Sequence, residues 1–255
     1  TCGSPLRTLP VIGISCIVMA ALLAIAELIA RDLAPWWPQE EAPERILDLC
    51  CGSGCLGILA QLQQPQAEVV LADLDADALE VARINCERFR MADSVEICQG
   101  DGLAAVRGQF DWIICNPPYV EAAEMDDIAA EYRHEPRQAL VSGADGLDFT
   151  RRLLHEAPDY LTERGLLVLE VGMSWPQLED AYPDAGFDWV EFERGGEGVC
   201  IISADELLAG KREQALQERR IKLGWFGIGD NPFFSVGLED LTAFGARFAC
   251  LATRG

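Results

Sequence analysis

The sequence predicts an α/β fold, a parallel, doubly wound sheet of seven strands built from residues 44–208. Two observations lead to this prediction. Short apolar runs recur along the segment, and stretches typical of helices separate several of them. Glycine, asparagine and aspartate residues follow the runs at their carboxyl ends. Strands that alternate with helices form a parallel sheet covered on both faces, and ligands bind outside the carboxyl ends of such strands.

The first half of this segment predicts four strands. Arg45-Ile-Leu-Asp-Leu-Cys50 is a short apolar run, and a glycine-rich turn ends it. Glu68-Val-Val-Leu-Ala-Asp73 is the next run, and a helical pattern follows each of the two. In order, the expected elements are strand 45–50, helix 55–63, strand 68–73, helix 76–89, strand 95–99 and strand 110–115.

The second half predicts three further strands. Leu166-Leu-Val-Leu-Glu-Val171 is its clearest apolar run. In order, the expected elements are helix 149–161, strand 166–171, helix 175–182, strand 187–193 and strand 198–202. We expect a mostly parallel sheet with an antiparallel last strand.

The two ends of the chain differ from this segment. Residues 8–26 carry no charge and approach the roughly 20 apolar residues of a membrane span or the apolar part of a signal peptide. Pro10 and Gly13 interrupt this run, and the residues from Ala20 onward are typical of a buried helix, so we expect no membrane association. Because the chain begins at Thr1, we expect a fragment, a processed form or an imperfect gene model.

Three regions are therefore expected along the chain. Residues 1–43 form an apolar N-terminal segment with a lead-in helix, truncated or atypical, residues 44–208 form the α/β domain, and residues 209–255 form a tail with a helix candidate at 211–222.

Composition restricts the function. The chain has 42 acidic and 20 basic residues, a formal charge of −22, and residues 44–208 hold 33 of the acidic and 11 of the basic ones. A phosphate backbone requires a basic face, so we expect no stable nucleic-acid partner. A basic protein partner fits this charge, although acidity also serves solubility alone. The 50% hydrophobic content excludes a disordered chain.

Several of the ten cysteines lie within apolar runs, which is typical of reduced thiols in a cytoplasmic protein. Cys50, Cys51 and Cys55 lack a second Cys-x-x-Cys pair, and the two histidines, at positions 134 and 155, are distant in sequence. We therefore expect no metal site.

The turn after the first strand is the first candidate for ligand binding. Gly52 and Gly54 allow a sharp turn and a close approach of the ligand, and Asp73 at the end of the second strand can accept hydrogen bonds from a ribose diol. Dinucleotide enzymes share this arrangement, although we interpret the turn as Gly-x-Gly without the third glycine of the dinucleotide fingerprint. A tight turn beside a solvated acid would look the same.

Asn116-Pro117-Pro118-Tyr119 directly follows the strand that ends at Cys115. The prolines remove two backbone donors and fix φ, which leaves carbonyl oxygens free to act as acceptors. With the Asn116 amide oxygen as a second acceptor and the tyrosine ring as a flat wall, this motif suits a planar NH₂ group.

These motifs resemble those of class I S-adenosylmethionine-dependent methyltransferases that act on an NH₂ nitrogen, a group that includes DNA amino methyltransferases and protein-glutamine methyltransferases. The segment from Glu131-Tyr-Arg-His-Glu-Pro136 to Asp145-Gly-Leu147 is similar to the glutamine branch. Within that branch it is more similar to the enzyme for the third large-subunit ribosomal protein than to the release-factor enzyme. The resemblance runs from about Ala24 to Leu208.

The resemblance implies a Rossmann-like fold, S-adenosyl-L-methionine as cofactor and a role for each motif residue. Asn116 and the Pro117 carbonyl would bind the substrate amide beside the cofactor, with Pro118 in the same turn and Tyr119 packed next to it. The cofactor site would consist of the methionine-end residues Cys50, Cys51, Gly52, Ser53 and Gly54, Asp48 below the turn, Asp73 at the ribose, and Asp101 with Gly102 at the adenine.

Two departures from the family pattern stand out. The family's turn begins Gly-Thr-Gly, whereas this chain has Cys50-Cys51 in the first two places, and we expect the loss of that first glycine to crowd the cofactor. The family also carries an N-terminal helical substrate-recognition domain, where this chain has the apolar residues 8–23.

The function that the resemblance implies is methyl transfer to the side-chain amide of a glutamine in a ribosomal protein. The alternatives are a release-factor glutamine methyltransferase, a nucleic-acid amino methyltransferase and a cofactor-binding remnant without activity. The oligomeric state stays open.

Overall fold

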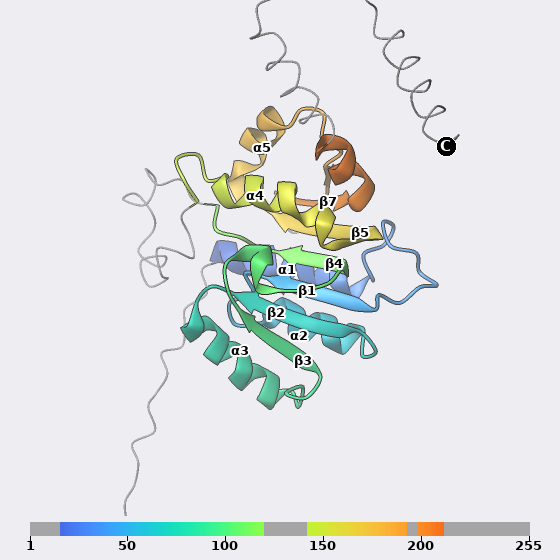
Figure 1. Ribbon diagram of the computed structural model, residues 1–255, viewed down its shortest axis with the longest axis vertical. Coiled ribbons are helices and arrows are strands. Elements are labelled where there is room, and N and C mark those ends of the chain that lie inside the picture. The colour runs from blue at the N-terminus through green and yellow to red at the C-terminus, as the bar shows by residue number, and fades with distance from the viewer. Residues whose placement is uncertain (1–15, 120–141, 193–197, 212–255) are drawn as a thin grey trace, which may run out of the picture. The chain divides into compact units, whose positions relative to one another are not determined.

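The computed structural model describes residues 16–119, 142–192 and 198–211. They belong to the first of two units of the chain, residues 1–211 and 212–255. A seven-stranded sheet in the order β3-β2-β1-β4-β5-β7-β6 lies at its centre (Figure 1). The pairs from β3 through β5 are parallel, and β7 runs antiparallel to both β5 and β6. The expected fold class is therefore confirmed.

The element bounds follow the apolar runs closely. The strands are β1 Arg45–Leu49, β2 Glu68–Asp73, β3 Val95–Gln99, β4 Phe110–Cys115, β5 Leu161–Glu170, β6 Asp188–Trp189 and β7 Val199–Ser203. The helices are α1 Cys16–Ala30, α2 Cys55–Gln63, α3 Ala76–Arg88, α4 Asp148–Glu156 and α5 Trp175–Ala181.

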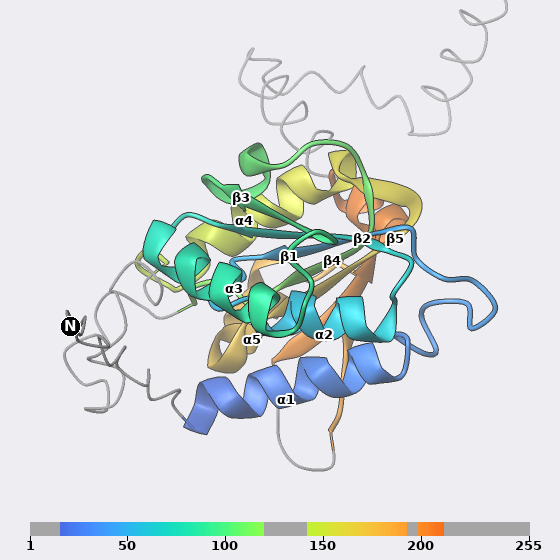
Figure 2. The same cartoon turned by 90° about the horizontal axis from the view of Figure 1, so that it is seen from below.

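Two hydrophobic layers cover the sheet. Side chains of α1, α2 and α3 pack on one face, where Ile25, Leu56 and Leu79 are buried against the strands. Side chains of α4 and α5 pack on the other face, together with the residues that follow β7. Figure 2 shows α1 and α2 stacked beneath the sheet. Both faces are thus closed, and the ligand-accessible positions are left at the strand ends.

Within residues 44–208, three expected elements differ in their bounds by more than one residue. The helix expected at 149–161 ends at Glu156, because Pro158 has no N–H to donate to the Leu154 carbonyl. β5 begins at Leu161 rather than at 166, and its register against β4 shifts between Leu161 and Leu166. β6 has two residues in place of the expected 187–193, and residues 193–197 lie outside the described part.

The helix expected from Ala20 already begins at Cys16. Among the described residues, we find no helix with the length and hydrophobicity that crossing a membrane requires. Most of the helix candidate at 211–222 lies outside the described residues, so it stays a prediction.

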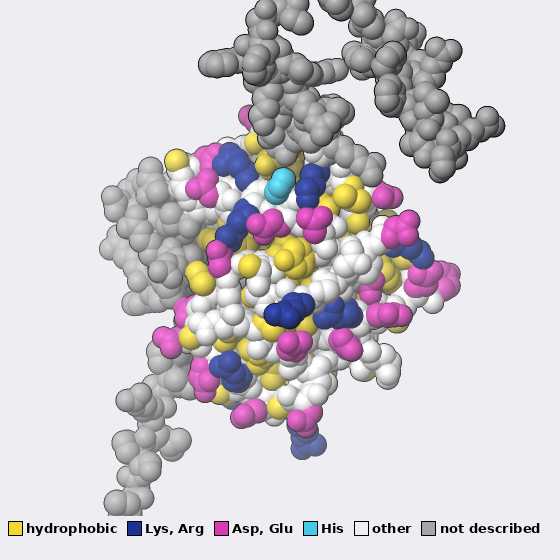
Figure 3. Space-filling model, viewed as in Figure 1, with side chains coloured by type: hydrophobic (Ala, Val, Ile, Leu, Met, Phe, Trp, Pro, Cys, Tyr) yellow, Lys and Arg dark blue, Asp and Glu magenta, His cyan; other side chains and the backbone are white. Residues whose placement is uncertain are grey.

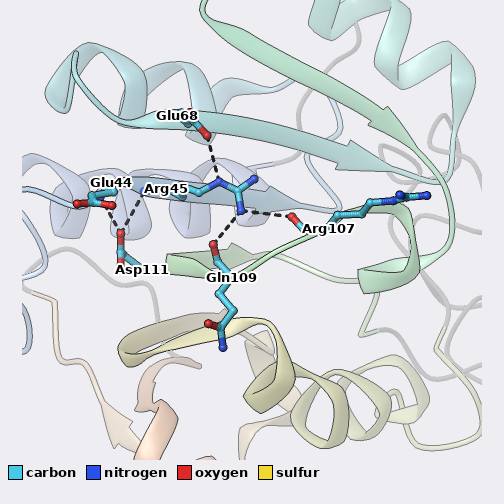
Figure 4. A network of polar contacts seen from close by, with 6 residues as sticks. All are labelled: Glu44, Arg45, Glu68, Arg107, Gln109 and Asp111. Atoms are coloured by element: carbon cyan, nitrogen blue, oxygen red, sulfur yellow. Dashed lines mark hydrogen bonds and ion pairs between the residues drawn. The ribbon is translucent and has the colours of Figure 1, made fainter.

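A polar network ties together the edge of the sheet where the central strands begin (Figure 4). The Asp111 carboxylate accepts hydrogen bonds from the backbone N–H groups of Glu44, at 2.7 Å, and Arg45, at 3.1 Å. The Arg45 guanidinium stacks 4.5 Å from the Phe110 ring centroid. It also donates to the Gln109 carbonyl at 2.9 Å, the Arg107 carbonyl at 3.3 Å and the Glu68 carboxylate at 3.2 Å.

Candidate active site

The candidate residues meet at the opposite edge, where the parallel strands end. β1 lies between β2 and β4, so the strand order reverses there. Such a switch point is the usual ligand position in a doubly wound sheet. Residues 50–54 follow β1, Asp73 ends β2, and Asn116 follows β4. Three segments distant in sequence therefore lie on neighbouring strands.

The turn after β1 depends on left-handed backbone conformations. Gly52 and Gly54 have φ of 54° and 75°. Cys50 has φ of 57°, and this conformation costs a residue with a side chain about 1–2 kcal/mol relative to glycine. Its thiol interacts with the Cys115 thiol in β4. Burial and this contact raise the pKa of Cys115. Cys50, in place of the family's first glycine, therefore introduces backbone strain. The expected crowding of the cofactor stays a prediction.

Asp73 is held by the turn that it faces. Its Oδ2 accepts the Gly52 N–H at 2.8 Å, and its Oδ1 accepts the Asp75 N–H at 2.9 Å. Each carboxylate oxygen can accept a second hydrogen bond, so Asp73 keeps capacity for a diol. Leu74 next to it is 55% exposed, and a Cβ added to Gly52 would meet open space. These residues fit a nucleoside cofactor, and the ribose contact assigned to Asp73 stays a prediction.

Asp48 lies below the turn and is 2% exposed. Its Oδ2 accepts the Gly57 N–H of α2 at 2.7 Å. Burial, with a smaller contribution from Asp73, raises its pKa to about 7 against the opposing effect of this hydrogen bond. Asp48 therefore connects β1 to the first turn of α2.

The expectation that the turn lacks a third glycine was wrong, because Gly57 occupies that place. A Cβ there would overlap Leu71 Cδ2 in β2 and lie 3.0 Å from Asp48 Cβ. The signal was present, because Gly52, Gly54 and Gly57 have the complete Gly-x-Gly-x-x-Gly spacing, in which the third glycine allows helix and strand to pack closely. The turn alone therefore does not distinguish a methyltransferase from a dinucleotide enzyme.

Asp101 forms an ion pair with Arg152, a residue that the sequence did not indicate as part of the site. Both of its carboxylate oxygens accept from the Arg152 guanidinium of α4, at 2.5 and 2.6 Å, and this lowers the pKa of Asp101. Arg152 lies 5.1 Å from the Phe149 ring centroid. Gly102 has φ of 59°, and a Cβ there would be 3.0 Å from Arg152 Nη2. The adenine contact assigned to Asp101 and Gly102 stays a prediction.

The Asn116–Tyr119 motif leaves β4 next to the end of β5. Pro117 is buried, and Asn116, Pro118 and Tyr119 are partly buried. The Tyr119 hydroxyl donates to Glu170 Oε1 at 3.3 Å, and the Tyr119 carbonyl accepts from Ser174 Oγ at 3.1 Å. Glu170 and Ser174 were not singled out from the sequence. The signal for Glu170 was an acidic residue inside the apolar run 166–171.

Other expected features lie outside the described residues. The Tyr-Arg-His-Glu-Pro motif and His134 fall within residues 120–141. Within the described ranges, no group of three or more His, Cys, Asp or Glu side chains could hold a metal ion.

Comparison with known proteins relates this geometry to one family. Residues 33–146 match the family model described as the methyltransferase small domain. The chain is 41% identical over 188 residues to the ribosomal protein uL3 glutamine methyltransferase of Francisella tularensis subsp. tularensis, covering 73% of this chain and 60% of that relative. A relative of the same name from Bordetella pertussis is 43% identical over 184 residues, 72% of this chain and 62% of its own.

A third relative of that name, from Neisseria gonorrhoeae, is 41% identical over 187 residues, which are 73% of this chain and 62% of the relative. The chain thus spans about three fifths of the length of the curated relatives it matches. The switch-point turn with Asp73, the Asn-Pro-Pro-Tyr motif after β4 and these similarities lead to one conclusion: residues 33–146 carry a methyltransferase small domain, and 73% of the chain is similar to a ribosomal protein uL3 glutamine methyltransferase.

Proposed function

We propose that this chain transfers a methyl group from S-adenosylmethionine to the side-chain amide nitrogen of a glutamine in a large-subunit ribosomal protein. The observation that carries the proposal is the Asn116–Tyr119 motif at the end of β4, next to the switch-point turn. The names of the relatives, which are 41–43% identical, favour ribosomal protein uL3 as the substrate.

Residues 44–208 would form the catalytic domain, and each motif would have a separate task. The turn from Cys50 to Gly54 would bind the methionine end of the cofactor and Asp73 its ribose. Asn116 and the Pro117 carbonyl would accept the two hydrogens of the substrate amide. Bound there, the cofactor supplies an electrophilic methyl group on a sulfonium.

The chain's residues would act by orientation and by hydrogen bonding. An amide nitrogen is a poor nucleophile because its lone pair is delocalised into the carbonyl. Two acceptors on its hydrogens favour a more pyramidal nitrogen as positive charge develops. Alignment of nitrogen, methyl and sulfur can contribute up to about 7–11 kcal/mol. The proton then leaves to solvent, so no strong base is needed.

The charge of the chain supports a basic protein substrate. On the face in Figure 3, the described acidic and basic side chains are interspersed, so attraction would come from the net charge and not from a single patch there. A ribosomal substrate would place the protein in the cytoplasm. The same charge disfavours a nucleic-acid substrate, the main alternative that shares an Asn-Pro-Pro-Tyr motif.

The test is labelled-methyl transfer onto undermethylated ribosomal proteins, with the modified residue identified by mass spectrometry. We expect a methylated glutamine with the wild-type chain. We expect Asn116→Ala to abolish transfer while cofactor binding, measured by calorimetry, largely survives. Unchanged turnover in Asn116→Ala would refute the role of Asn116, and cofactor binding without transfer to any ribosomal protein would favour an inactive remnant. A gel shift at physiological salt would support the nucleic-acid alternative.

A further inference from the structure

Glu170 is a buried acid that the proposed chemistry does not use. It ends β5, between β4 and β7, and only 2% of it is exposed. Cys115 of β4 pairs with Leu169 of β5, so the next residues along these strands are Asn116 and Glu170. An acidic side chain therefore lies on the strand position next to the residue proposed to bind the substrate amide.

The segment that begins at Glu170 holds Tyr119 at several points. Glu170 Oε1 accepts from the Tyr119 hydroxyl at 3.3 Å, and Ser174 Oγ donates to the Tyr119 carbonyl at 3.1 Å. A Cβ on Gly172 would lie 2.8 Å from the Tyr119 ring, and a Cβ on Gly146 would overlap the Tyr119 carbonyl oxygen. Tyr119 is thus fixed at its ring, its hydroxyl and its backbone.

The environment of Glu170 favours a neutral carboxyl group. Its Oε2 is buried and has no hydrogen-bond partner among the described residues. A buried carboxylate needs several donors or a cation to offset the loss of hydration. Burial raises the pKa of Glu170 to about 8, and the hydrogen bond from Tyr119 opposes this only in part.

Charged groups on the surrounding elements have other partners. Val199 of β7, which pairs with Glu170, is apolar. Among the described charged groups of α1, β6 and β1, Glu27 pairs with Arg31 just after α1, Asp188 accepts from Trp36 Nε1, and Asp48 accepts from the Gly57 N–H.

We propose that Glu170 is a positioning residue, whose uncharged carboxyl group fixes Tyr119 and thereby holds the Asn116 and Pro117 acceptors in the geometry that methyl transfer requires. The catalytic consequence of this proposal rests on the proposed function. The contact of Glu170 with Tyr119 and the protonation state of Glu170 do not depend on that function. Glu170 would act through Tyr119 and would not take the proton of the substrate amide.

The experiment compares Glu170→Gln, Glu170→Ala and Glu163→Gln in the full chain. Glutamine keeps an uncharged acceptor for Tyr119, and alanine removes it. Glu163 is an exposed residue on the same strand, so its substitution controls for the loss of one carboxylate. At pH 7, we expect Glu170→Ala to lower kcat by about tenfold or more through misplacement of the acceptors, with a smaller change in the Kd of S-adenosylmethionine. Glu170→Gln should restore most of the lost rate.

The pH profile separates positioning from proton transfer. We expect the wild-type rate to fall as the pH rises through about 8, because ionisation places a buried charge beside Tyr119 with no cation among the described residues to balance it. This fall should be absent in Glu170→Gln. An inactive Glu170→Gln variant, or a wild-type rate that rises through this range, would overturn the proposal and assign Glu170 as a base. Equal rates for wild type and Glu170→Ala would also overturn it.

A stability measurement keeps the inference testable if the chain methylates no ribosomal protein. The pKa of Glu170 is raised from an ordinary value of 4.5 to about 8, so the folded state binds the extra proton between these values and stability is lost as the pH rises through them. We expect Glu170→Gln to lose this dependence and Glu163→Gln to follow wild type. An unchanged pH dependence in Glu170→Gln would refute the neutral carboxyl whatever the substrate is.

Discussion

At the edge where the strands begin, charged side chains have several partners each, whereas at the edge where they end, two acidic side chains are buried with one hydrogen bond each. Arg45 donates to two carbonyls and a carboxylate, and Asp111 accepts two backbone N–H groups. At the other edge, Asp48 and Glu170 are each 2% exposed, and burial raises the pKa of both.

The difference indicates what each edge contributes. Paired groups at the first edge hold three strands in register, which is a structural task. The buried acids with raised pKa values and the left-handed Cys50 lower the stability of the protein. Such destabilising features cluster at functional sites. The following changes test this contrast, from the largest expected effect to the smallest.

Asp48→Asn should remove a pH dependence of stability. The pKa of Asp48 is raised from 3.8 to about 7, so the folded state binds more protons than the unfolded state between these values. Wild-type stability should therefore fall as the pH rises through this range, by up to about 4 kcal/mol from this residue. Urea unfolding between pH 4 and 8 measures the slope. A variant that keeps the wild-type slope would contradict the neutral state of Asp48.

Asp73→Ala should weaken cofactor binding, because it removes the proposed acceptor of the ribose diol. Loss of one charge-assisted hydrogen bond costs about 1.5–3 kcal/mol, a ten- to hundredfold rise in Kd for S-adenosylmethionine by calorimetry. Asp111→Ala, at the opposite edge, is the matched control. It should lower the free energy of unfolding and leave Kd unchanged, and the reverse pattern would overturn the assignment of the two edges.

Gly57→Ala should destabilise the protein by about 1–3 kcal/mol, because the new methyl group overlaps Leu71 Cδ2 and pushes α2 away from β2. Thermal and urea unfolding measure the loss. Gly210→Ala is the control, since a Cβ there meets nothing within 4 Å. Equal stability of the two variants would show that α2 shifts away from β2 without cost.

Cys50→Gly should stabilise the protein by about 1 kcal/mol or less. Glycine removes the left-handed strain at φ of 57°, and the greater freedom of glycine in the unfolded chain offsets part of the gain. Urea unfolding measures the difference. A loss of stability would show that the contact of Cys50 with Cys115 outweighs the strain.

The sequence was sufficient to predict the elements whose pattern is local. Apolar runs gave β1 to β4 within a residue, and the glycine turn and Asn116–Tyr119 mark the ends of β1 and β4. The partners of these motifs could not be predicted, because Glu170 and Ser174 lie more than fifty residues from Tyr119 in sequence. They contact Tyr119 only because β5 pairs with β4 in the sheet. The Asp101–Arg152 pair depends likewise on how α4 crosses the sheet.

The two buried acids also change how ligand binding is to be measured. The formal charge of −22 counts Asp48 and Glu170 as ionised, whereas both bind protons near neutral pH. A cationic cofactor that enters beside them would change their proton occupancy. The observed calorimetric enthalpy would then vary with the ionisation enthalpy of the buffer, so a titration repeated in phosphate and in Tris would count the protons released on binding.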